Sequence, residues 1–149
     1  MPSIFDQLRA GIETKSAAET QYAAQALAAA LPPDAILALH GDLGVGKTTF
    51  VQGLARGFGI HEPVTSPTFN IYTVHRAPGR TLVHLDAYRL DHPRQVEDLL
   101  LEDFLRTPWC LAIEWPEKIA EWIPSHALHL ELGITQDEHH TIRLISPGT

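Results

Sequence analysis

Residues 41–48 read Gly-Asp-Leu-Gly-Val-Gly-Lys-Thr, and this stretch decides the fold. An apolar run at residues 36–40 comes directly before it, and a short apolar run that ends in glycine is typical of a buried parallel strand. Apolar residues at helical spacing follow from Lys47, so a helix is expected there. A strand, a glycine-rich loop and a helix in this order predict a phosphate-binding loop, or P-loop.

The residue types in this loop have chemical reasons. Glycines at 41, 44 and 46 let the backbone turn so that its amides point inward around a phosphate, and the following helix adds its own free amides. Lys47 would reach the β- and γ-phosphates, and the Thr48 hydroxyl would bind magnesium. The alternative is a glycine turn with a lysine there by chance, and the flanking strand and helix favour nucleotide binding. The predicted nucleotide-binding residues of the loop are Gly41, Gly44, Val45, Gly46, Lys47, Thr48 and Thr49.

The composition is that of an ordinary globular domain. The chain has 149 residues, of which 44% are hydrophobic and 19% charged, and no low-complexity linker divides it. We therefore expect residues 1–149 to form a single domain. No run approaches the roughly 18 apolar residues that span a bilayer, and the first residues lack the pattern of a secretory signal. The one cysteine, Cys110, cannot form an internal disulfide, so a reducing cytoplasm is the expected location.

The net charge of −7 bears on the kind of partner. Proteins that bind nucleic acid usually present a basic face, which releases counterions from the phosphates. Here only 11 Lys and Arg residues are present, and they are scattered along the chain. Direct, tight binding to RNA or DNA is therefore not expected.

Predicted strands and helices alternate along the chain. The first predicted helix begins at a capping box formed by Ser16 and Glu19. Further helices are expected over residues 47–58, 93–105 and 117–123, and strands over residues 36–40, 70–74, 81–85 and 110–115. Alternating leucines predict a final antiparallel hairpin across residues 135–140. We therefore expect an α/β fold, a three-layer P-loop NTPase-like sandwich with a mainly parallel sheet and an antiparallel C-terminal hairpin.

Nucleotide hydrolysis needs an acid and a group that orients the attacking water, in addition to a P-loop. Glu114 ends the apolar run 110–114, where the acid of such an enzyme (the Walker B acid) would lie; the alternative is a solvated glutamate at a strand end. Asp86 ends another predicted strand and shares a strand face with His84. It could hold a magnesium-bound water or position the nucleophile.

A polar loop, residues 65–69, follows the P-loop helix. In GTPases this location belongs to a switch segment whose hydroxyl senses the γ-phosphate through magnesium. Thr68 is the candidate, with Ser66 as the alternative, and a plain turn remains equally open. The nine histidines form no His-Glu-x-x-His array and there is no second cysteine, so a structural zinc site is not expected.

Four segments together resemble one known family. They are the P-loop at 41–49, Ser-Pro-Thr-Phe at 66–69, His-Leu-Asp-Ala-Tyr-Arg-Leu at 84–90 and Ile-Glu-Trp-Pro-Glu at 113–117. On these motifs the chain is identified as a member of the bacterial TsaE (YjeE-type) P-loop ATPases of tRNA threonylcarbamoyladenosine (t6A) biosynthesis. The resemblance covers nearly the whole chain. The sequence departs from it at residues 99–101, three leucines where many relatives have a glycine, and in a short tail after Ile145.

The resemblance implies an activity and partners. Proteins of this kind hydrolyse ATP weakly on their own, with bound Mg²⁺, and act with two partners, TsaB and TsaD. TsaD transfers the threonylcarbamoyl group to a tRNA adenosine, and the ATPase cycle supports repeated turnover of the assembly. The tRNA would be held chiefly by the partners, which agrees with the acidic net charge of this chain.

The resemblance also implies roles for single residues. Lys47 and Thr48 match the phosphate and magnesium contacts, and Thr68 matches the switch threonine. Asp86 matches an aspartate of the catalytic network and Glu114 the acid that binds magnesium or orients water, followed by a matching tryptophan, Trp115. Adenine is expected near Ser16, at the start of the first predicted helix, and near the last hairpin loop.

Two other functions remain open from the sequence. A P-loop kinase for small molecules would close an arginine-bearing lid over the phosphates, and this chain has Arg89, Arg94 and Arg106 but no lid-length insertion. A nucleotide-dependent binding switch would use Thr68 and Glu114 to recruit a protein without significant turnover. The Asn-Lys-x-Asp signature for guanine is absent from the sequence, which favours ATP.

Overall fold

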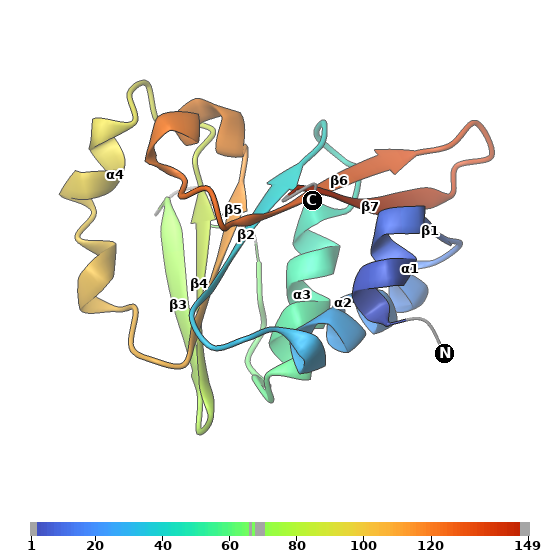
Figure 1. Ribbon diagram of the computed structural model, residues 1–149, viewed down its shortest axis with the longest axis horizontal. Coiled ribbons are helices and arrows are strands. Elements are labelled where there is room, and N and C mark those ends of the chain that lie inside the picture. Colours follow the sequence, from blue (N-terminus) through green and yellow to red (C-terminus); the bar gives the residue numbers. More distant parts are fainter. Residues whose placement is uncertain (1–2, 66, 68–70, 147–149) are drawn as a thin grey trace.

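One mixed sheet of seven strands runs through the protein, in the order β1-β7-β6-β2-β5-β4-β3 (Figure 1). The computed structural model describes residues 3–65, 67 and 71–146. The strands are β1 (Ile12–Thr14), β2 (Ala35–His40), β3 (Tyr72–Ala77), β4 (Arg80–Asp86), β5 (Trp109–Glu114), β6 (Leu128–Ile134) and β7 (His140–Ser146). Its four central strands, β6, β2, β5 and β4, run parallel to one another, and antiparallel pairs flank them on both sides.

Helices cover both faces of this sheet. The α-helices are α1 (Ile4–Ala10), α2 (Ala17–Ala30), α3 (Lys47–Gly57) and α4 (Arg94–Asp98), and two 3₁₀ segments are η1 (Leu101–Asp103) and η2 (Pro116–Trp122). Leu37 and Leu39 of β2 belong to the core layer under α1, α2 and α3. Ile36, on the opposite side of β2, belongs to the layer under α4, η1 and η2. The predicted α/β class and the three layers are therefore confirmed (Figure 1).

The register of the central strands places their carboxyl ends together. Leu39 of β2 lies opposite Glu114 of β5, which in turn lies opposite Asp86 of β4. Because β2 and β5 are covered on both faces, their residues are almost all apolar and buried, as a central parallel strand requires. Polar side chains at the strand ends therefore meet at one edge of the sheet, where the loop after β2 begins.

The predicted C-terminal hairpin and the first predicted helix are confirmed. Strands β6 and β7 pair antiparallel, and β3 and β4 pair around residues 78–79. The Ser16 hydroxyl accepts a hydrogen bond from the Glu19 amide at 3.1 Å, which caps α2 as the sequence predicts. Helix α1 and strand β1 are additional to the elements predicted from the sequence, and the predicted strand start at residue 70 lies outside the described residues. Among the described residues, no helix is both long and apolar enough to cross a membrane.

The prediction of one helix over residues 93–105 was wrong. Helix α4 ends at Asp98, and the short η1 begins only at Leu101. Between them Leu100 adopts the left-handed conformation, with φ 53° and ψ 44°, which interrupts the helical hydrogen bonding. A residue with a Cβ is strained in this conformation, which glycine adopts readily.

Replacing Leu100 with glycine is expected to stabilise the protein. The Leu100 side chain is 58% exposed, so little packing is lost, and relief of the backbone strain should raise the free energy of unfolding by about 0.5–1 kcal/mol. Urea denaturation of the two proteins measures this difference. As the matched control, Leu101→Gly removes a buried side chain and should cost about 3 kcal/mol. A Leu100→Gly protein less stable than the parent would contradict the strain.

Candidate functional site

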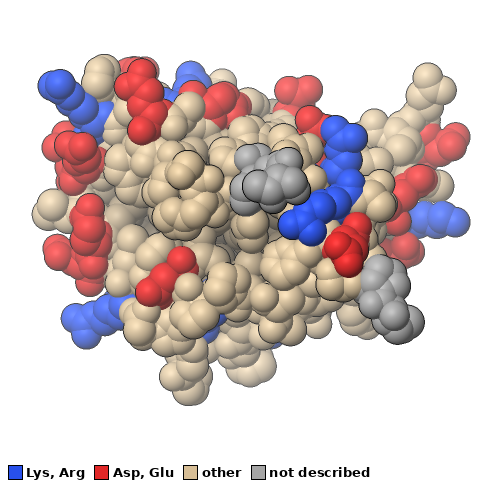
Figure 2. Space-filling model, in the orientation of Figure 1, with Lys and Arg blue, Asp and Glu red and all other residues tan. Residues whose placement is uncertain are grey.

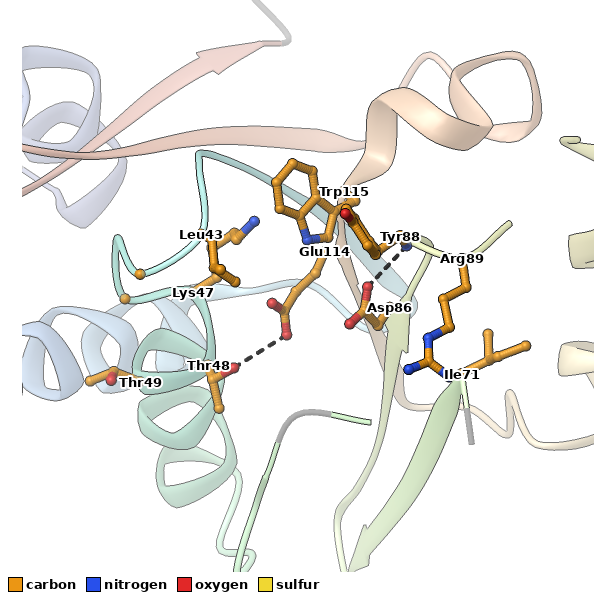
Figure 3. Close-up of a pocket in the computed structure, with 12 residues that line it drawn as sticks. Leu43, Lys47, Thr48, Thr49, Ile71, Asp86, Tyr88, Arg89, Glu114 and Trp115 are labelled. Atoms are coloured by element: carbon orange, nitrogen blue, oxygen red, sulfur yellow. Dashed lines mark hydrogen bonds between the residues drawn. The ribbon is translucent and has the colours of Figure 1, made fainter. Parts of the chain in front are cut away.

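A cavity of about 650 Å³ opens where β4 and β5 end beside the loop after β2. This volume is in the range of small-molecule sites. Side chains from the loop, from α3 and from both strand ends point into it (Figure 3). The lining residues are Leu43, Gly44, Gly46, Lys47, Thr48, Thr49, Ile71, Asp86, Tyr88, Arg89, Glu114 and Trp115.

The loop 41–48 has the backbone geometry of a phosphate cradle. Gly44 and Gly46 have φ values of 86° and 99°, which L-residues with a side chain rarely adopt. A Cβ at Gly41 would lie 2.6 Å from the Leu132 carbonyl oxygen, so only glycine fits between the loop and β6. Helix α3 then begins at Lys47 without a side-chain cap, which leaves its first amides available to an anion.

Lys47 lies across the mouth of its own loop. Its ammonium donates a hydrogen bond to the Gly41 carbonyl at 2.6 Å and lies 3.7 Å from the centroid of the Trp115 ring. Burial lowers the pKa of the ammonium, and the negative charges of Glu114, Glu117 and Asp86 act against this shift. The Lys47 ammonium is thus held at the cavity by a carbonyl, an aromatic face and nearby carboxylates. A bound phosphate could take the place of these contacts or add to them.

Two acidic side chains stand at the strand ends. Glu114 is 5% exposed, and its Oε2 is 3.5 Å from the Thr48 hydroxyl, which donates to it, and 2.5 Å from the His84 ring (Figure 3 shows the first contact). Asp86 accepts a hydrogen bond from the Tyr88 amide at 3.0 Å. Burial raises the pKa of Asp86; the Tyr88 amide partly offsets this, and the charge of Glu114 adds to it.

These groups match the oxygen ligands that magnesium prefers. A threonine hydroxyl and two carboxylates face one cavity, and the carboxylates raise each other's energy unless a cation lies near them. Thr48 and Glu114 are therefore the residues that could hold the metal, with Asp86 beside them. Among the described residues, no group of three or more His, Cys, Asp or Glu side chains is arranged to hold a metal ion.

Aromatic and cationic side chains form the outer wall. Tyr88 packs against Trp115 with ring centroids 5.1 Å apart, and Lys118 lies 5.7 Å from the Tyr88 ring. Leu43, at the tip of the loop, is 87% exposed, and Tyr88 is 57% exposed. Large apolar and aromatic side chains are therefore exposed to solvent at the mouth of the cavity.

The predicted site residues differ in where they lie. Lys47, Thr48, Asp86 and Glu114 meet at the cavity, together with the loop positions Gly44, Gly46 and Thr49. Val45 is buried in the core, and its carbonyl accepts a hydrogen bond from the His140 ring at 2.9 Å. Ser16 caps α2 and does not line the cavity, so its predicted contact with adenine stays a prediction. Thr68 and Ser66 lie outside the described residues.

Sequence reasoning missed several contributors to this site. Ile71 lines the cavity, and its left-handed φ of 67° gives no recognisable signal in the sequence. His140 contacts the loop only because the last hairpin brings β7 back beside it. His84 was noticed for sharing a face with Asp86, but its contact with Glu114 depends on the pairing of β4 with β5.

Comparisons with known proteins give one consistent result. A family model described as "Threonylcarbamoyl adenosine biosynthesis protein TsaE" matches residues 14–143. Two relatives bear the description "tRNA threonylcarbamoyladenosine biosynthesis protein TsaE". The one from Rickettsia bellii is 39% identical over 121 residues, 80% of this chain and 83% of its own length. The one from Bacillus subtilis is 35% identical over 130 residues, 87% of this chain and 81% of its own length.

A solved structure agrees with the sequence relatives. The crystal structure of YdiB from Bacillus subtilis superimposes with a TM-score of 0.75 at 32% sequence identity. The match covers 90% of this chain and 82% of the YdiB chain. The shared fold thus extends over nearly all of the sheet and its helices.

The raised pKa of Asp86 predicts that its charge opposes folding. A carboxyl group whose pKa is higher in the folded than in the unfolded protein stabilises the fold while it is protonated, at a pH below its unfolded pKa. This stabilisation is lost as the pH rises through the folded pKa. Asp86→Asn, which can still accept the Tyr88 hydrogen bond, should therefore raise the melting temperature at neutral pH by roughly 1–3 °C without metal.

The pH dependence provides the check on this prediction. The gain from Asp86→Asn should shrink as the pH is lowered toward the usual range of carboxyl pKa values. Asp137→Asn, at an exposed position in the last hairpin loop, should leave the melting temperature almost unchanged. A destabilised Asp86→Asn protein at neutral pH would show that the charge contributes to folding instead.

Proposed function

This chain belongs to the TsaE family of threonylcarbamoyladenosine biosynthesis proteins, and from that premise we propose that it is the ATP-binding and ATP-hydrolysing subunit of the t6A machinery. The observation that carries the proposal is the convergence of Lys47, Thr48, Asp86 and Glu114 on one cavity beside an uncapped helix start. In this arrangement a cation at the loop faces two acids at the strand ends. Such an arrangement suits a magnesium–triphosphate better than a neutral ligand.

The loop binds and orients the phosphates. Its amides and the first turn of α3 surround them, and the Lys47 ammonium leaves the Gly41 carbonyl to reach the β- and γ-phosphates. The Thr48 hydroxyl and Glu114 are the side chains that would hold Mg²⁺. When bound, the metal supplies positive charge that neutralises the phosphate oxygens during transfer.

The strand ends supply the residues that act on water. Glu114 would orient the attacking water, and Asp86 would support it from the neighbouring strand. Arg89 and Tyr88 close the outer side of the cavity. Thr68 couples the γ-phosphate to the surface that partners contact, as a switch residue would.

The proposed partners are TsaB and TsaD, whose threonylcarbamoyl transfer this ATPase would support in the cytoplasm. Leu43, Tyr88 and Trp115 line the mouth of the cavity and offer the partners an apolar surface beside the proposed nucleotide. In Figure 2 acidic side chains lie along both ends of the visible face, with Lys and Arg interspersed among them. Together with the net charge of −7, this supports contact with tRNA only through the partners.

Magnesium-dependent ATP hydrolysis, measured with the protein alone and with added TsaB and TsaD, tests this function. We expect weak hydrolysis alone and strong stimulation by the pair. Lys47→Ala should weaken ATP binding about tenfold or more, because it removes the phosphate contact. Glu114→Ala should change ATP binding by less than about threefold and abolish hydrolysis, because it acts on water and metal. ATP binding without hydrolysis under any condition would favour a nucleotide switch, and equal activity of the Glu114→Ala protein would remove its catalytic role.

Movement of Lys47 should be visible in tryptophan fluorescence. The ammonium lies over the Trp115 ring, so its transfer to phosphates changes the field at the indole and hence the emission. We expect ATP with magnesium to change the emission of the parent protein and to leave Trp115→Phe, which retains Trp109 and Trp122, unchanged. An equal response in both proteins would show that Lys47 does not leave the ring.

A further inference from the structure

His84 is a histidine wholly enclosed in the protein, on the strand beside the acid of the proposed site. It lies in β4, two residues before Asp86, on the face that carries Leu82 toward the core under α2 and α3. Its exposed fraction is 0%, and its Nε2 is 2.5 Å from Oε2 of Glu114. Unlike Asp86, it does not line the cavity, so it reaches the chemistry only through Glu114.

The two ring nitrogens of His84 differ in a way that fixes the tautomer. Nδ1 is buried and has no hydrogen-bond partner among the described residues. A buried N–H without an acceptor costs more than an unpaired lone pair that a small shift or a water can satisfy. The proton that joins the two side chains therefore belongs on Nε2, where Glu114 accepts it.

This contact restrains a carboxylate that has few other partners. Glu114 is nearly buried, and the Thr48 hydroxyl lies at a longer distance from the same oxygen, 3.5 Å against 2.5 Å for the His84 ring. Both donors contact the same oxygen, Oε2, and hold it in place while the nearby Lys47 ammonium attracts the carboxylate electrostatically. The orientation of Glu114 is thus set by the His84 ring, which is buried and does not line the cavity.

We propose that His84 is a positioning residue for Glu114, holding the carboxylate in the orientation that binds the metal or orients the attacking water. The inference rests on the proposed ATPase function. It adds to the site a residue that belongs neither to the loop 41–48 nor to the Walker B position. In many metal sites a group behind the ligand carboxylate or imidazole has this role, and its loss typically costs about 10–100-fold in affinity or activity. His84 would do the same through a hydrogen bond donated by Nε2.

Two substitutions distinguish a buried histidine that only fills space from one that positions Glu114. The His84→Gln variant places an amide N–H near the position of Nε2 and can still donate to Glu114, whereas the shorter amide of His84→Asn cannot reach it. Both variants keep a polar side chain of intermediate size in the same enclosed space. A role in packing alone would affect the two similarly, while a role in donating to Glu114 separates them.

Steady-state kinetics with these variants is the first test. We expect His84→Asn to lower kcat about 10–100-fold with little change in KM, and His84→Gln to recover most of the loss. Equal kcat values for the Asn and Gln variants would overturn the proposal.

His75→Leu is the matched control. His75 is also a mostly buried histidine paired with a glutamate, with Nδ1 2.8 Å from Glu62, but it lies on β3 and away from the cavity. Its loss should lower the melting temperature and leave kcat within about twofold of the parent. A comparable drop in kcat for His75→Leu would show that loss of any buried histidine–glutamate pair in this sheet impairs turnover, and would overturn a specific role for His84.

Two readouts on the protein without turnover separate this inference from the proposed function. Two-bond ¹H–¹⁵N spectra of the nucleotide-free protein, with His84→Gln used to assign the signals, should show the proton on Nε2; a proton on Nδ1 alone would overturn the proposal. The gain in ATP affinity on adding magnesium should fall in His84→Asn by no more than it falls in Glu114→Ala, less than about threefold, and should recover in His84→Gln. A larger fall in His84→Asn than in Glu114→Ala would overturn the proposal. If the parent binds magnesium–ATP but never hydrolyses it, the ATPase function fails while these two measurements still decide the role of His84.

Discussion

The alignment of three strand ends is the constraint on which the rest of this structure depends. Strands β2, β5 and β4 are parallel and in a register that sets Leu39, Glu114 and Asp86 side by side. Because parallel strands all end at the same edge, the loop that leaves β2 faces the acids that end β5 and β4. A slip of one residue in either pairing would turn an acid to the other face of the sheet and separate it from Lys47.

The same alignment imposes an electrostatic cost. An ammonium and two carboxylates are withdrawn from water at one edge, and burial shifts the pKa values of Lys47 and Asp86 toward their neutral forms. Such arrangements reduce stability and are retained where a ligand provides the missing charge. The surrounding contacts reduce this cost locally: the Gly41 carbonyl and Trp115 ring at Lys47, the Tyr88 amide at Asp86, and the His84 ring at Glu114.

What the sequence predicts well is what depends on local chemistry. The loop 41–48 is recognisable because glycine spacing, an apolar run and a helix start are contiguous, and Glu114 is recognisable because it ends a buried run. The contacts of His84 and His140 could not be predicted, because both depend on strands paired across the sheet. The break at Leu100 could not be predicted for another reason: leucine favours a helix, and the left-handed conformation is rare for a residue with a Cβ.

A crystal structure with magnesium and a non-hydrolysable ATP analogue tests the central claim most directly. The account predicts the triphosphate within the loop 41–48, the Lys47 ammonium moved from the Gly41 carbonyl to the phosphates, and a metal held near Thr48 and Glu114. His84 should still contact Glu114 in that complex. Phosphates bound elsewhere, or a metal far from the ends of β4 and β5, would contradict it.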